Sequence, residues 1–254
     1  MITKTELNKL VEKYETIDFI KDDPIQFPHK GKCKEEIELY GFIASLFAYG
    51  NRKIFIKKLD EIFAKAEGDL VGFIKNGDFS NLKGVEYRFS KENDIIPIFE
   101  ILSDLYNESS GLEELFEYAW IQPELYLDFG EKQQMFMQAV VDFFYSRVSE
   151  NVGQGFFHMV PNPKNGGAMK RLNMFLRWMV RKGPVDLGIW RFMQPKDLLI
   201  PLDVHVARVS REMGLLTRKS NDFKAVVELT NSLKNISPED PIKYDFAMFG
   251  FGVQ

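Results

Sequence analysis

The chain has 254 residues, 45% of them hydrophobic, and a formal net charge of −4 at neutral pH. This apolar content excludes a globally disordered chain, and the length suits one large domain or two small ones. A single cysteine, Cys33, excludes an internal disulfide, a four-cysteine zinc site and an iron–sulfur cluster. Because the sequence shows neither a signal-peptide pattern nor a membrane-spanning apolar run, we expect a cytoplasmic monomer that needs no metal or cofactor.

The first half of the chain has the apolar periodicity of helices. A helix is predicted over residues 4–15, and a polar loop with two prolines follows at residues 22–29. Residues 35–49 are apolar around most of a helical circumference, which predicts a central, buried helix. Further helices are predicted from residue 52 to about residue 66 and over residues 69–75, 94–107, 111–120 and 131–148. No alternation long enough for a strand is present, so the predicted fold class is all-α.

The junction after the buried helix is polar and basic. Gly50 is suited to end the helix, and Asn51 is suited to cap the next one. The neighbouring Tyr49, Arg52 and Lys53 would suit a ligand there. The alternative is an ordinary turn between two helices.

The second half continues with a loop over residues 156–167 and a helix over residues 168–180. The polar residues of that helix form one stripe, made of Lys170, Asn173, Arg177 and Arg181. Polar groups on an otherwise buried helix must face a cleft, a partner or each other. A connection follows over residues 186–199, with at most a short helical turn. The next helix is predicted to start at Asp203, as its cap, and to end at residue 214. Two more helices are predicted over residues 221–234 and 238–249.

Charge is concentrated in this half. Residues 164–219 contain twelve lysines and arginines and four acidic residues, a balance of +8, which leaves −12 for the rest of the chain. Such a basic segment is a possible footprint for a polyanion, and the alternative is an ordinary basic face of a folded domain.

Three stretches resemble parts of the helix-hairpin-helix DNA glycosylases, the superfamily of endonuclease III and 8-oxoguanine glycosylase. Residues 202–209 resemble the segment V-D-T-H-V-x-R-V, whose aspartate is the family's catalytic carboxylate. Residues 166–170 lie where the family places its hairpin and, in bifunctional members, a nucleophilic lysine. Residues 42–52 resemble its buried helix and DNA-inserting loop.

The sequence also departs from that family. Residues 160–167 replace the usual hairpin Leu-Pro-Gly-Val-Gly, the iron–sulfur cysteines are missing, and the Lys170 to Asp203 spacing is closer to that of archaeal 8-oxoguanine glycosylases. The chain is likewise similar over nearly its full length to a bacterial family of conserved proteins of unknown function, through residues 49–53, 171–178 and 201–205. The resemblance therefore says more about the fold than about the activity.

The resemblance implies one two-lobed, all-α unit over residues 1–254. One lobe would comprise residues 35–182 with the hairpin, and the other would comprise residues 1–34 with 199–254. The implied activity is excision of a damaged base from duplex DNA, with Lys170 as nucleophile, Asp203 as its partner close by, and AP-lyase activity. The residues expected to contact DNA are Tyr49, Asn51, Arg52, Lys53, Gly166, Gly167, Asn173, Arg177, Arg181, His205 and Arg208.

Other interpretations of these residues stay open. Lys170 could be a solvated lysine, and Asp203 could be only a helix cap worth about 1 kcal/mol. Four side chains could in principle hold a divalent ion, although their spacing matches no common metal signature: Asp23, His29, Asp203 and His205. The chain could also be a catalytically silent nucleic-acid-binding module, or a protein-interaction domain, for which net acidity is natural.

Overall fold

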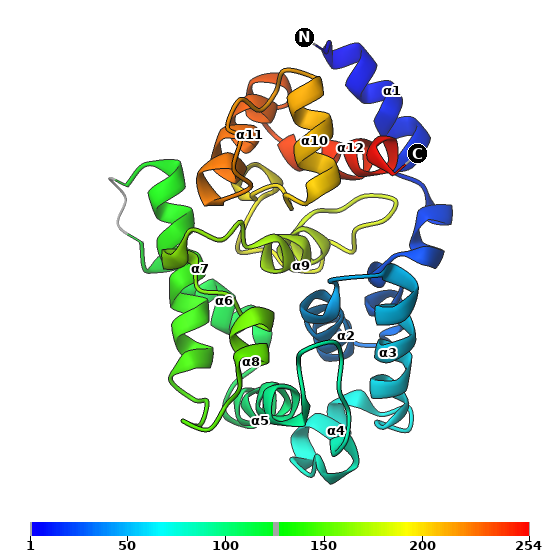
Figure 1. Ribbon diagram of the computed structural model, residues 1–254, viewed down its shortest axis with the longest axis vertical. Coiled ribbons are helices and arrows are strands. Elements are labelled where there is room, and N and C mark those ends of the chain that lie inside the picture. Colours follow the sequence, from blue (N-terminus) through cyan, green and yellow to red (C-terminus); the bar gives the residue numbers. More distant parts are fainter. Residues whose placement is uncertain (1, 124–126, 254) are drawn as a thin grey trace. The chain divides into compact units, whose positions relative to one another are not determined.

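The computed structural model describes residues 2–123 and 127–253, and every regular element within these ranges is a helix (Figure 1). Pairing of the β type is limited there to three isolated bridges. The all-α prediction is therefore confirmed. In the same part of the chain, no helix is long and apolar enough to cross a bilayer.

The chain divides into two compact units. The central unit comprises Asp22–Asn162, and the terminal unit comprises the residues up to Lys21 together with those from Pro163 onward. The predicted boundaries differ at two places: they placed residues 163–182 in one lobe with residues 35–162, and they placed residues 22–34 in the lobe of the chain ends. Helix α9 (Lys170–Val180) belongs instead to the terminal unit, where its arginines pair with carboxylates from near both ends of the chain.

The central unit is built around α2. Its α-helices are α2 (Lys34–Phe47), α3 (Arg52–Ala64), α4 (Leu70–Asn76), α5 (Glu92–Glu108), α6 (Leu112–Ile121), α7 (Phe129–Tyr145) and α8 (Gln154–Met159). Its short 3-10 helices are η2 (Pro24–Gln26), η3 (Pro28–Lys30) and η4 (Ser80–Leu82). Helix α2 packs against α3, α4, α6, η2 and η3. Its residues from Gly41 to Phe47 are all buried, as the apolar circumference predicted.

At the α2–α3 junction the predicted cap Asn51 is confirmed, but Gly50 does not end the helix, because α2 stops at Phe47 with Ala48 as its C-cap. Gly50 has a positive φ of 82°, which glycine adopts without a steric cost. The Asn51 side chain accepts a hydrogen bond from the Ile54 backbone N–H at 3.3 Å, so Asn51 is the N-cap of α3. These two residues turn the chain sharply and leave the first turn of α3 at the surface.

Helix α8 lies where the sequence predicted a loop. Six residues are too short to show a helical period, so the turn residues around them dominated the pattern. The helix is held by Asp94, whose buried carboxylate accepts from the backbone N–H groups of Lys91 (2.9 Å) and Phe156 (3.3 Å). A partner 62 residues away in sequence therefore fixes the start of α8.

The terminal unit combines the two ends of the chain. Its α-helices are α1 (Lys4–Tyr14), α9, α10 (Val204–Glu212), α11 (Phe223–Ile236) and α12 (Asp245–Gly252). Its 3-10 helices are η1 (Ile17–Asp22), η5 (Pro163–Asn165), η6 (Pro195–Asp197) and η7 (Pro241–Tyr244). The last residue of η1 lies one position beyond the unit boundary at Lys21. Helix α12 packs against α1 and α10, so the first and last helices of the chain share one core.

Candidate lysine–aspartate site

Lys170 and Asp203 lie together in the terminal unit, each at the start of a helix. The Lys170 Nζ is 3.8 Å from the Asp203 Oδ2, an ion-pair separation longer than a direct hydrogen bond. The lysine side chain is 35% exposed and the aspartate side chain 12% exposed. The predicted closeness of these two groups is confirmed, and the amine remains accessible from solvent.

The two oxygens of Asp203 have different partners. Oδ1 accepts hydrogen bonds from the backbone N–H groups of His205 and Val206, both at 2.8 Å, and thereby caps α10. Oδ2 is the oxygen nearest to Lys170. The cap fixes the carboxylate at the positive end of the helix, where a negative charge is favourable. The helix cap and the lysine therefore use different oxygens of Asp203.

The backbone before Lys170 forms a tight turn. Gly166 has a φ of 76°, its N–H donates to the Pro163 carbonyl at 3.0 Å, and its own carbonyl accepts from the Phe223 N–H at 2.9 Å. A Cβ on Gly166 or Gly167 would meet no atom within 4 Å, so this backbone faces open space. A phosphate could approach it closely, as the two glycines were expected to allow.

Met169 caps α9 with a left-handed backbone, at φ 50°. For a residue other than glycine this conformation costs about 1–2 kcal/mol. The Met169 side chain is buried, which holds the residue in this conformation. Lys170 therefore leaves the turn in a fixed direction, at the first position of α9.

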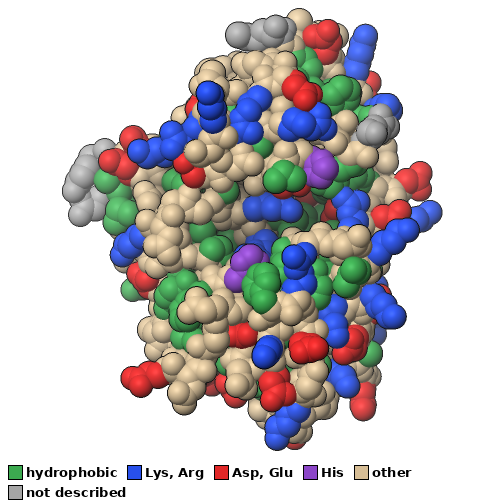
Figure 2. Space-filling view, viewed as in Figure 1, with side chains coloured by type: hydrophobic (Ala, Val, Ile, Leu, Met, Phe, Trp, Pro, Cys, Tyr) green, Lys and Arg blue, Asp and Glu red, His purple; other side chains and the backbone are tan. Residues whose placement is uncertain are grey.

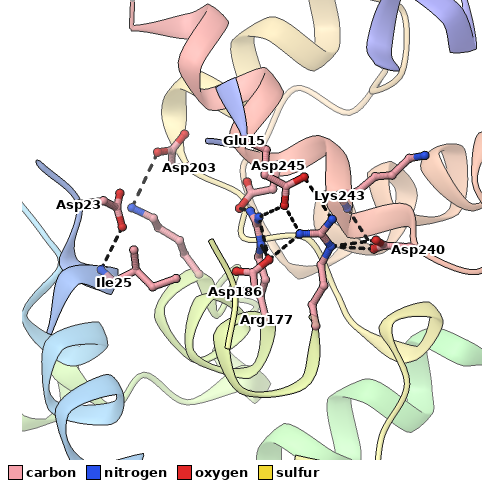
Figure 3. Close-up of polar contacts among 11 residues, drawn as sticks. Glu15, Asp23, Ile25, Arg177, Asp186, Asp203, Asp240, Lys243 and Asp245 are labelled. Atoms are coloured by element: carbon pink, nitrogen blue, oxygen red, sulfur yellow. Dashed lines mark hydrogen bonds and ion pairs between the residues drawn. The ribbon is translucent and has the colours of Figure 1, made fainter. Parts of the chain in front are cut away.

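A buried ionic cluster lies in the same unit as the pair (Figure 3). We call it the arginine cluster; it comprises Glu15, Arg177, Arg181, Asp186, Asp240 and Asp245. Arg177 donates to Asp186 from Nε and Nη2, both at 3.1 Å, and to Asp245 from Nη1 at 2.6 Å. Its guanidinium also lies 3.8 Å from the centre of the Phe246 ring. These contacts fasten α9 to α12.

Arg181 completes the cluster. It donates to Asp240 at 2.8 Å, to Asp186 at 2.6 Å and to both oxygens of Glu15. The neighbouring carboxylates raise the pKa of Arg181 further above its already high value, against the effect of burial. Arg181 therefore stays charged and joins α9 to the segment after α1.

The arginine cluster corrects part of the predicted DNA interface. Arg177 is fully buried and Arg181 nearly so, and both guanidinium groups are bonded to carboxylates of their own unit. Asn173 is also buried, with its Nδ2 donating to the Ala168 carbonyl at 3.1 Å. Phosphates cannot reach these three side chains in this structure. The polar stripe was expected to face a cleft, a partner or its own members. The two arginines of the stripe face one another and their acidic partners.

Asp245 is a buried carboxyl of the cluster. Burial raises its pKa to about 6, the bond from Arg177 opposes that rise, and the charges of Asp203 and Asp186 add to it. The cluster thus contains a carboxyl whose pKa lies above its ordinary value. Nothing in the sequence around Asp245 indicated this, because its burial depends on the packing of α12.

His205 and Arg208 connect α10 to the end of α12. The His205 Nδ1 lies 3.1 Å from the Gly252 carbonyl oxygen, and the Arg208 Nη2 donates to the same oxygen at 2.8 Å. Arg208 also pairs with Glu212 at 2.9 Å, and its side chain is half exposed. The structure therefore gives both residues a packing role, while Arg208 still has N–H groups near solvent that could contact a phosphate.

Several basic residues of the 164–219 segment have acidic or carbonyl partners. On the face shown in Figure 2, lysine and arginine side chains (blue) are spread among acidic ones (red). Within residues 164–219, Arg218 pairs with Asp222 at 2.6 Å, and Arg211 donates to the Arg218 carbonyl at 2.8 Å. Part of the +8 balance is thus neutralised or used inside the terminal unit.

The remaining expected DNA contacts belong to the central unit. Asn51 and Lys53 are exposed, and Arg52 and Tyr49 are partly exposed. The Tyr49 hydroxyl lies 3.0 Å from the Ser90 Oγ and 3.3 Å from the Tyr87 carbonyl oxygen, so this ring is held in place. Among the described residues, no group of three or more histidine, cysteine, aspartate or glutamate side chains is arranged to hold a metal ion.

Comparison with known proteins places the chain in a family without assigning it an activity. No curated protein matches it, and no solved structure does. The family model that matches covers most of the chain, from residue 23 to residue 254, and includes both Lys170 and Asp203. The chain belongs to the family described as "Protein of unknown function (DUF2400)".

Proposed function

We propose that this protein is a DNA glycosylase with AP-lyase activity and that it acts through Lys170 and Asp203. The observation that carries the proposal is the 3.8 Å separation between a partly exposed amine and a carboxylate whose other oxygen is fixed by a helix cap. An amine nucleophile and a charge that stabilises a cationic sugar are the groups that base excision at C1′ requires. The resemblance of residues 202–209 to the glycosylase segment supports the same assignment.

The chemistry starts from an extruded nucleotide, and the Lys170 ammonium must first give up a proton so that its amine can attack. The amine attacks C1′, the bond from C1′ to the base breaks, and the base leaves with the electron pair and takes up a proton. Asp203 stabilises the positive charge that develops on the sugar. The attached nitrogen then loses a proton, the C1′–O4′ bond breaks as O4′ takes up a proton, and the nitrogen lone pair forms a protonated Schiff base between Lys170 and C1′.

The lyase step follows from that Schiff base. Loss of a proton from C2′ expels the 3′ phosphate by β-elimination, and hydrolysis of the Schiff base restores the lysine. The open backbone at Gly166 and Gly167 would hold a phosphate of the substrate near the start of α9. The arginine cluster would act through position, because it fixes the helix that carries Lys170.

The test is borohydride trapping on duplex DNA that contains an abasic site, with a second duplex that contains 8-oxoguanine. The wild-type chain should form a covalent adduct with the abasic duplex, and Lys170→Ala should form none while it still binds DNA. Lys224→Ala is a matched control, since Lys224 is an exposed lysine in the first turn of another helix of the same unit. It should trap as the wild type does.

Two results would contradict the proposal. Trapping that survives Lys170→Ala would place the nucleophile elsewhere. DNA binding by a wild-type chain that gives no adduct and releases no base would favour a silent nucleic-acid-binding module.

A further inference from the structure

An aromatic cluster lies in the central unit and contains neither Lys170 nor Asp203. The Phe89 ring centre is 4.4 Å from that of His158, with an edge-to-face angle of 85°. Tyr49 contacts both rings, at 5.7 Å from Phe89 and 4.8 Å from His158, and it also contacts Tyr87 at 4.8 Å. We call Tyr49, Phe89 and His158 the aromatic platform.

The platform is buried on one side and exposed on the other. Tyr87 beneath it is 3% exposed, Tyr49 is half-buried, His158 is exposed and Phe89 is 49% exposed. An aromatic ring left half in water forgoes part of the hydrophobic gain of burial. The exposed faces of Phe89 and His158 therefore offer apolar, aromatic area that a planar ligand could cover.

The turn that carries Phe89 has an unusual backbone. Tyr87 and Ser90 exchange two backbone hydrogen bonds, of 2.8 and 3.0 Å, so that Arg88 and Phe89 form a two-residue hairpin turn. Arg88 has a φ of 55°, a conformation that such turns normally give to glycine, asparagine or aspartate. A strained arginine at an exposed turn is a feature that often accompanies binding.

Basic residues adjoin the platform in the chain, with Arg88 next to Phe89 and Arg52 and Lys53 shortly after Tyr49. A Cβ built on Gly50 would lie 2.3 Å from the Arg88 Nη1, so the Arg88 guanidinium lies against the α2–α3 junction. Arg52 and Lys53 occupy the first turn of α3, directly after that junction. An aromatic surface beside three cations suits bases together with their phosphates.

The two halves of the platform are held by one buried group. Asp94 accepts from the N–H of Lys91, directly after the turn, and from the N–H of Phe156, in the helix that carries His158. The backbones approach closely there, since a Cβ on Gly155 would lie 2.7 Å from the Ser90 Cα. The geometry of Phe89 and His158 is thus set before any ligand arrives, which lowers the cost of binding.

We propose that the aromatic platform stacks an unpaired nucleobase of single-stranded DNA, and that Arg88, with the first turn of α3, holds the adjacent phosphates. Stacking needs an exposed aromatic face and tolerates any base, and the cations supply affinity for the backbone. The site shares Tyr49, Arg52 and Lys53 with the expected DNA contacts, but it goes beyond the proposed glycosylase activity because it adds Phe89, Arg88 and His158 and uses neither Lys170 nor Asp203.

The experiment measures binding of the full-length chain to a short single-stranded DNA that carries 2-aminopurine, followed by fluorescence and anisotropy. The wild type should bind the single strand more tightly than the same sequence as a duplex, with a change in 2-aminopurine fluorescence. Phe89→Ala should weaken binding about 5- to 150-fold, the range expected for one lost stacking contact. Phe89→Trp should restore binding, and Phe89→Leu should not.

Arg88→Gly tests the turn. It should weaken binding and lower the slope of log affinity against log salt by about 0.7, the value for one phosphate contact on a single strand. The same change should leave the melting temperature unchanged or higher, because glycine suits a positive φ. A loss of binding could then not be attributed to unfolding.

Tyr118→Ala is the matched control, because Tyr118 is an aromatic residue of the same unit that is 63% exposed. It should bind as the wild type does. Lys170→Ala should also keep single-strand binding, so failure of the glycosylase proposal would leave this result intact. Wild-type affinity in both Phe89→Ala and Phe89→Leu, or a wild-type chain that does not bind the single strand, would overturn the proposal.

Discussion

Asp203 shows how one side chain can serve both the fold and the proposed reaction. Its Oδ1 accepts the two N–H groups at the start of α10, and its Oδ2 lies nearest to Lys170. A helix cap is worth about 1 kcal/mol, which an amide oxygen supplies as well as a carboxylate oxygen does. The charge is what the amide lacks, and the proposed stabilisation of a cationic sugar depends on that charge.

Replacing Asp203 by asparagine should therefore separate the two roles. Asp203→Asn should melt close to the wild-type temperature and lose most base-excision and lyase activity, whereas Asp203→Ala should also lose about 1 kcal/mol of unfolding free energy. Thermal unfolding and single-turnover kinetics on the same samples measure the two effects. An Asp203→Asn variant with full activity would leave Asp203 as a cap alone.

At the scale of the element, α9 carries both the proposed nucleophile and the arginines that fix its position. Lys170 is at its first turn, and Arg177 and Arg181 are two and three turns further on, bonded to carboxylates from other segments. Removing one member of a buried ionic group leaves its partner charged and unpaired, which costs several kcal/mol. The helix position is thus strongly coupled to the charge state of its acidic partners.

Asp245 makes this coupling dependent on pH. Its folded pKa of about 6 lies above the ordinary value of 3.8, so the native state binds more protons than the unfolded state between these values. The contribution of Asp245 to stability should accordingly fall as the pH rises from 4 to 6, by up to about 3 kcal/mol. Chemical unfolding of the wild type and of Asp245→Asn should be measured at several pH values. The unfolding free energy of the wild type, relative to that of Asp245→Asn, should fall as the pH rises from 4 to 6. Parallel profiles would contradict the assignment.

At the scale of the molecule, the terminal unit is assembled from the two ends of the chain. The central unit is formed by the residues between them in sequence. Glu15 bonds to Arg181 across 166 residues, and α12 packs against α1. Glu15, directly after α1, therefore helps to hold α9 in place, although the two segments are far apart in sequence.

Glu15→Gln should destabilise the terminal unit more than the central one. The lost charge leaves Arg181 less compensated in a buried site, with an expected cost of about 3 kcal/mol or more. Hydrogen exchange resolved by segment should show faster exchange in α1, α9 and α12 and little change in α2 and α5. Glu12→Gln, an exposed glutamate of α1, should change neither group of helices. Equal loss of protection in both units would show that they unfold together.

The sequence by itself determined the features that depend on near neighbours. Apolar periodicity identified the long helices and the all-α class, and the caps Asn51 and Asp203 were correct because a cap bonds to a residue two or three positions away. The resemblance of residues 202–209 led to the pairing of Lys170 with Asp203, which the structure confirms as a contact. Their catalytic roles stay a prediction.

Only the tertiary structure decided where the polar side chains of the helices point. Helical spacing put Lys170, Arg177 and Arg181 on one polar stripe, but it could not show that carboxylates at positions 15, 186, 240 and 245 would meet the two arginines. The unit boundaries and the short helix α8 were decided in the same way, by contacts across many residues. The sequence position of an arginine does not predict its ion-pair partner. An ion pair depends on distance in space, and the fold brings the partner from a distant part of the chain.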